Sequence, residues 1–178
     1  RNMLCTELTK EAKRNRVCEE ATVWHSLECE RSGVWMTDRP CEVVQMRRET
    51  RDLFGDILIG GLGLGVAPMM LLDDVVERER NVQSITIVEK DPNVIKLVWP
   101  MVQQSAMALG IKAKVVCADL FTFLRDAAQL EDPPLYDSAM YDIWQSDGLG
   151  TFFNVVVPLR ELSHGLVRGG QVACWNED

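Results

Sequence analysis

The 178-residue sequence predicts an α/β fold whose core is a doubly wound, mostly parallel sheet of about five strands. Two observations predict this fold. From residue 56 onward, short apolar runs alternate with longer runs that favour helix. The short runs are apolar along most of their length rather than at every second position, as is typical of parallel strands with helices on both faces. Strict β-α alternation therefore indicates a sheet with right-handed crossovers.

The expected strands and helices of this sheet follow one another in order. We expect strands at 56–61, 84–90, 113–119, 136–142 and 170–175, with a helix between each strand and the next. The helix after the second strand contains Pro100 and is followed by Gly110, so we expect it to bend at the proline and to stop at the glycine.

Residues 1–52 differ in character and are expected to form a helical and hairpin appendage to a Rossmann-like domain at 53–178. Residues 1–32 are polar and charged, which predicts one or two amphipathic helices. The turn signal Asp38-Arg39-Pro40 then separates two apolar-leaning pieces. This pattern predicts a short hairpin or a strand-turn-helix unit.

The composition limits the classes of partner. Asp and Glu number 27 against 19 Lys and Arg, so the overall field repels polyanions and nucleic acid is an unlikely partner. Basic runs at 10–16 and 47–51 are interpreted as solvated helix faces. The six cysteines are scattered, without a C-x-x-C pair or a usual zinc spacing, which favours a reducing, cytoplasmic setting and no metal. No apolar run is long enough to span a membrane.

A glycine-rich turn, Gly61-Leu62-Gly63-Leu64-Gly65, follows the first expected strand. Ligands of such sheets bind beyond the carboxyl ends of the strands, and glycines let a ligand approach the main chain closely. The spacing is G-x-G-x-G. The dinucleotide fingerprint needs Gly or Ala three residues after its second glycine. That position is Val66 if the motif starts at Gly61 and Pro68 if it starts at Gly63, so the fingerprint is incomplete. A phosphate-binding P-loop is excluded because no Gly-Lys-Ser or Gly-Lys-Thr follows.

Three carboxylates follow the next three expected strands. Glu89 is placed to accept hydrogen bonds from both hydroxyls of a ribose, and Asp119 could accept one from an adenine amine or cap the following helix. With the glycine turn, this set indicates an adenosine-containing cofactor. Asp142 is either a catalytic carboxylate or a loop cap, and Asp147 takes its place if that strand ends five residues later.

Four motifs carry a family resemblance, and they occur in the family's order. "ILIGGLGLG", "ITIVEKDPNVIKL", "VVCADLFTFL" and "YDSAMYD" resemble the motifs of class I S-adenosylmethionine-dependent methyltransferases, and within them the spermidine synthase-like branch. The resemblance covers roughly residues 54–175. It implies that Gly61, Gly63 and Gly65 line the methionine and ribose part of the cofactor, with Glu89 on the ribose and Asp119 on the adenine.

For the reacting centre, the resemblance implies that Asp142 orients or deprotonates an amine nucleophile. Trp144, two residues further on, would stack on the substrate or form the wall of its pocket. The chain departs from the branch at Leu62 and Leu64, where the branch usually has glycine and aspartate, and in "DIWQSDG", which replaces "DSSDP".

The ordinary methyltransferase topology has two further strands, which this sequence does not supply before Asp178. Two alternatives follow: either the last two strands have been lost from the C-terminus, or the sheet is a minimal five-stranded one. In the second case we expect a second copy of the chain, in a homo-oligomer, to cover the edge strand.

The first functional hypothesis is a cytoplasmic methyltransferase that acts through S-adenosylmethionine on a small or medium polar acceptor. The second is a spermidine synthase-like aminopropyltransferase, which would use decarboxylated S-adenosylmethionine. The third is a non-catalytic, methyltransferase-like binding module. Leu62 and Leu64 keep the third hypothesis open.

Overall fold

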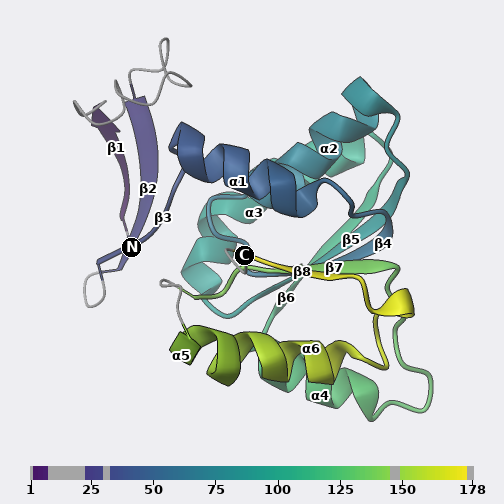
Figure 1. Cartoon of the computed structure of the whole chain (residues 1–178). Helices are drawn as coiled ribbons and strands as arrows, with labels where there is room; N and C mark the ends of the chain where they lie inside the picture. Colours follow the sequence, from purple (N-terminus) through teal and green to yellow (C-terminus); the bar gives the residue numbers. More distant parts are fainter. Residues whose placement is uncertain (1, 8–22, 30–32, 145–148, 176–178) are drawn as a thin grey trace.

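The computed structural model describes residues 2–7, 23–29, 33–144 and 149–175, and its centre is a five-stranded sheet (Figure 1). The strands are β4 (Gly55–Gly60), β5 (Val82–Glu89), β6 (Lys112–Cys117), β7 (Ser138–Tyr141) and β8 (Val172–Cys174). Their order is β6-β5-β4-β7-β8, and every neighbouring pair is parallel. The expected doubly wound sheet is confirmed, and each strand boundary lies within two residues of its expected place.

Helices cover both faces of this sheet (Figure 1). They are α1 (Pro40–Thr50), α2 (Val66–Arg78), α3 (Pro92–Ala108), α4 (Leu120–Ala128), the short α5 (Leu149–Thr151) with a π-helical turn at Phe152–Val156, α6 (Val157–Ser163) and a 3₁₀ turn at Arg168–Gly170. Ile57 and Ile59 of β4 pack with α1, α2 and α3, whereas Leu58 packs with α4 and α6. This alternation explains why β4 is apolar along its length.

The helix α3 shows how its sequence signals act. It runs through Pro100 without ending there, and its last residue is Ala108. Gly110 follows with φ of +70°, the left-handed conformation that favours glycine after a helix. The expected stop at Gly110 is therefore confirmed.

The N-terminal part forms a second, antiparallel sheet of β1 (Asn2–Glu7), β2 (Val23–Cys29) and β3 (Gly33–Thr37). The expectation of amphipathic helices over 1–32 is wrong for residues 2–7 and 23–29, which are strands, and residues 8–22 lie outside the described part. β2 pairs with the β-branched and aromatic residues of "GVWMT" in β3 on one side and with β1 on the other, and these pairings override the weak helical preference of the polar sequence.

The strand-turn-helix unit after residue 33 is confirmed by β3 and α1. The turn between them is fixed by Asp38, whose carboxylate accepts a hydrogen bond from the backbone N–H of His25 and contacts its Nδ1, both at 2.6 Å. Met46 of α1 packs in the same core as α2. The division of the chain at residue 52 stays a prediction.

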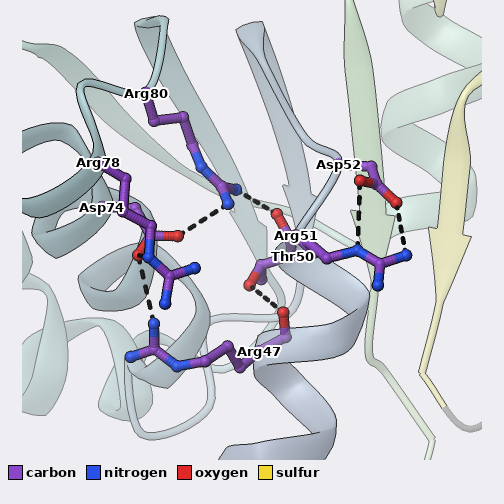
Figure 2. A network of polar contacts seen from close by, with 7 residues as sticks. All are labelled: Arg47, Thr50, Arg51, Asp52, Asp74, Arg78 and Arg80. Carbon is purple, nitrogen blue, oxygen red and sulfur yellow. Dashed lines mark hydrogen bonds and ion pairs between the residues drawn. The ribbon is translucent and has the colours of Figure 1, made fainter.

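A buried carboxylate ties α1 to α2 (Figure 2). Asp74 of α2 has only 2% of its side chain exposed and forms ion pairs with Arg80 at 2.8 Å, Arg47 at 3.3 Å and Arg78 at 3.4 Å. Arg80 also donates a hydrogen bond to the carbonyl oxygen of Thr50. Arg47 therefore belongs to a structural network.

Among the described residues, no helix is long and apolar enough to cross a membrane.

Replacing Asp74 tests this network. We expect Asp74→Asn to lower the free energy of unfolding by about 3 kcal/mol, because it leaves the largely buried Arg80 without its charge partner. Denaturant unfolding measures the loss. Asp73→Asn, which removes the same charge from an exposed neighbouring position, is the matched control. Equal stability of the two variants would contradict the role assigned to Asp74.

Candidate active site

Parallel pairing brings the predicted site residues to one edge of the sheet. Gly60, the last residue of β4, is in register with Val88 on β5 and Tyr141 on β7. The next residue of each chain segment, namely Gly61, Glu89 or Asp142, therefore lies at the same carboxyl edge. The backbone N–H of Gly61 donates to Val88 at 2.8 Å, and that of Asp142 donates to Gly60 at 2.9 Å.

The glycine loop needs its glycines for steric reasons. Gly61, Gly63 and Gly65 have φ of +94°, +51° and +79°. A Cβ on Gly61 would lie 2.3 Å from the carbonyl oxygen of Asp142, so the loop passes directly over the end of β7. Gly65 is the N-cap residue of α2.

The two leucines of the loop are core residues. Leu62 is 2% exposed and packs in the core beneath α2, and Leu64 is 9% exposed. Their side chains therefore fill the interior, while the backbone of the loop faces the edge of the sheet. The departures from the family pattern at these positions have a packing explanation.

Glu89 braces the glycine loop, a role that sequence reasoning missed. Its Oε2 accepts a hydrogen bond from the backbone N–H of Leu62 at 2.9 Å, and its Oε1 accepts one from that of Asp91 at 2.8 Å. Each carboxylate oxygen can accept two hydrogen bonds, so capacity remains for the two hydroxyls of a ribose.

Asp119 lies one strand further along the same edge and caps α4. Its Oδ1 accepts from the backbone N–H of Thr122 at 3.1 Å and from its hydroxyl at 3.3 Å. The helix-capping interpretation of this residue is confirmed. Its role toward an adenine amine stays a prediction.

A cavity of about 200 Å³ opens beside Asp142. Its lining comes from β3, α1, the start of α2 and the ends of β7 and β8: Val34, Trp35, Met36, Thr37, Glu42, Met46, Val66, Asp142, Trp144 and Trp175. Trp144 thus lies in the cavity wall, whereas Asp147 lies outside the described residues. Sequence reasoning missed Trp175, although it directly follows the last strand, where the other candidate residues also lie.

Asp142 has an unusual electrostatic setting in this cavity. Burial, followed by the negative charges of Glu42 and Glu49, raises the pKa of its carboxyl from 3.8 to about 7. Glu42 is held in place by the backbone N–H and the hydroxyl of Thr37, at 2.9 and 2.6 Å. No basic side chain lines the cavity in the described part of the chain. Near neutral pH, Asp142 is thus able both to take up and to release a proton.

Solved structures with a related chain fold include enzymes of more than one kind. A methyltransferase from Thiobacillus denitrificans, crystallised with S-adenosyl-L-homocysteine, shares 16% identity at a TM-score of 0.44, over 76% of this chain and 47% of its own. MnmC2 from Aquifex aeolicus shares 14% sequence identity at a TM-score of 0.48, and the match covers 94% of this chain and 67% of MnmC2. Shikimate dehydrogenase from Mycobacterium tuberculosis shares 15% sequence identity at a TM-score of 0.43, and the match covers 93% of this chain and 58% of the dehydrogenase.

These likenesses are too distant to assign a ligand or a reaction to the chain. The chain also spans only about half the length of the first of these structures. No protein-family model matches the sequence, and no curated protein matches it. We therefore infer the function from the residues of the site itself.

Alanine substitutions at two glycines distinguish the cost of backbone strain from the cost of a steric clash. Gly33 and Gly61 both have positive φ, but a Cβ on Gly33 would meet nothing within 4 Å. We expect Gly33→Ala to cost about 1 kcal/mol of unfolding free energy and Gly61→Ala clearly more, because the second also displaces the end of β7. Thermal unfolding of both variants measures the difference. Equal losses would show that the loop does not depend on close approach to Asp142.

The raised pKa of Asp142 predicts a pH-dependent stability difference. The folded state holds its proton more tightly than the unfolded chain, so wild type loses stability as pH rises from the ordinary value of 3.8 to about 7. We expect Asp142→Asn to match wild type at pH 4 and to be more stable than wild type above pH 7. Melting temperatures of wild type and of Asp142→Asn across this pH range measure the gap in stability between them.

Asp132→Asn is the control for this comparison, because it removes the same charge from an exposed loop. A gap between wild type and Asp142→Asn that stays constant with pH, or that matches the gap of the control, would contradict the assigned environment of Asp142.

Proposed function

We propose that the chain is an S-adenosylmethionine-dependent methyltransferase whose acceptor is a small or medium polar molecule held beside Asp142. One observation carries the proposal: the glycine loop, Glu89 and Asp142 meet at one sheet edge, next to a cavity that contains the Asp142 carboxylate. Only β4 would thus separate Glu89, proposed to bind the adenosine part, from Asp142, proposed to take up the proton. The likeness to methyltransferase structures concerns the fold and adds nothing to this proposal.

The residues present fit this cofactor. Gly63 leaves a hollow in the loop that a Cβ would fill, and the loop backbone approaches the edge of the sheet closely. Gly61, Gly63 and Gly65 would line the methionyl and ribose part, Glu89 would accept from the ribose hydroxyls, and Asp119 from the adenine amine. When bound, S-adenosylmethionine supplies a methyl carbon that its positively charged sulfur makes electrophilic.

The chain's own contribution is to position the acceptor and to manage its proton. The Asp142 carboxylate, with its pKa of about 7, can accept a proton from the acceptor's polar group at neutral pH. Trp144 and Trp175 line the cavity with aromatic rings, against which the acceptor would pack. Holding the nucleophile in line is the larger part of the catalytic effect in such a transfer.

The other hypotheses from the sequence stay hypotheses. No contact among the described residues favours aminopropyl transfer or the spermidine synthase-like branch over methyl transfer. β8 pairs with β7 and lies at the edge of the described sheet, so homo-oligomer formation at this edge stays part of the proposal, as does a cytoplasmic location.

Calorimetric titration with S-adenosylmethionine and S-adenosylhomocysteine tests the proposed cofactor. We expect wild type to bind both, and Glu89→Gln to bind roughly tenfold or more weakly, because its single amide oxygen cannot brace the loop and also accept from both ribose hydroxyls. The amide oxygen of Glu89→Gln can still brace one backbone N–H of the loop. Glu77→Gln, exposed on α2, is the matched control. Absence of wild-type binding, or unchanged binding by Glu89→Gln, would remove the basis of the proposal.

A further inference from the structure

The side chain of Met36 sits in the glycine loop. Its Sδ atom accepts a hydrogen bond from the backbone N–H of Leu64 at 3.3 Å. A Cβ on Gly63 would lie 2.5 Å from this sulfur and 3.3 Å from the terminal methyl carbon. The thioether therefore fits only because position 63 is glycine. Met36 belongs to β3, so this contact joins the N-terminal sheet to the loop that starts α2.

The group that fills this hollow has a shape similar to part of the proposed ligand. The methionyl part of S-adenosylmethionine is also an unbranched chain that leads to a methylated sulfur, although that sulfur is a sulfonium and also carries the adenosyl group. While Met36 is in place, the N–H of Leu64 and the surface of Gly63 are covered. We propose that Met36 competes with the cofactor for the glycine loop and must leave it before the cofactor binds. This inference rests on the proposed function.

The contacts around Met36 favour movement of its side chain rather than of the whole strand. Asp38 fixes the end of β3 to His25, and Glu42 holds Thr37. Trp35 lies against the ammonium group of Lys90, 5.3 Å from the ring centre. Met36 itself is held by a sulfur acceptor, which is weak, and its three rotatable bonds let it swing away while β3 stays.

Met36 also lines the cavity beside Asp142, so the same side chain lies between the loop and the cavity. Withdrawal from Gly63 would thus change the shape of the cavity. Cofactor binding and the form of the acceptor pocket become coupled through one residue. The apparent affinity for the cofactor is lowered in proportion to the fraction of molecules in which the loop is covered.

Titration of the whole chain with S-adenosylhomocysteine tests the competition. We expect Met36→Ala to bind about fivefold or more tightly than wild type, because it uncovers the loop. Met36→Leu, which keeps the bulk, is expected to stay much closer to wild type. Met107→Ala, which shortens a methionine that is 72% exposed on α3, is the control. Without ligand, amide hydrogen exchange at Leu64 should be faster in Met36→Ala.

The outcomes separate this inference from the proposed function. Equal or weaker binding by Met36→Ala, with wild type binding, overturns the competition and leaves the cofactor assignment standing. Weaker binding in particular would mean that Met36 forms part of the cofactor's site. If neither protein binds, the proposed function fails and the competition fails with it, even where exchange at Leu64 confirms the contact.

Discussion

The parallel pairing of β4 with β5 and β7 is the constraint on which the rest of the structure depends. β4 is buried on both faces, with Ile57, Leu58 and Ile59 at most 1% exposed. Because side chains alternate between the faces, a slip of one residue would exchange the two cores, so burial fixes the register. That register aligns the carboxyl ends of three strands. Gly61, Glu89 and Asp142 meet for this reason, before any ligand contributes.

The residues proposed to bind the cofactor, and the one proposed to compete with it, also stabilise the edge of the sheet. Glu89 braces the backbone of the glycine loop, Asp119 caps a helix, and Met36 fills the hollow at Gly63. Binding would therefore exchange the contact of Met36 with the loop for contacts with the ligand, whereas Glu89 has acceptor capacity for both. Asp142 differs, because its burial and the nearby carboxylates of Glu42 and Glu49 raise its pKa, and no basic side chain among the described residues lines the cavity beside it.

Most of the sheet, and the position of Gly61, Glu89 and Asp142 at its carboxyl edge, could be predicted from sequence, because continuous apolar strands and the glycine loop are local signals. The strands β1 and β2 could not, because their polar residues gain strand structure only through the pairing of β1 with β2 and of β2 with β3. The contact of Met36 with Leu64 joins residues 28 positions apart, and the ion pair of Asp74 with Arg47 spans 27. Nothing in a single sequence marks such pairs. The burial of Leu62 likewise depends on the core beneath α2.

The crystal structure of the chain with S-adenosylhomocysteine tests the central claim most directly. We expect the adenosyl part to contact Glu89 and Asp119 and the sulfur end to lie over Gly63. We also expect the Met36 side chain to be withdrawn from the loop. A ligand bound elsewhere on the molecule, or one bound at this edge without contact to Glu89, would contradict it.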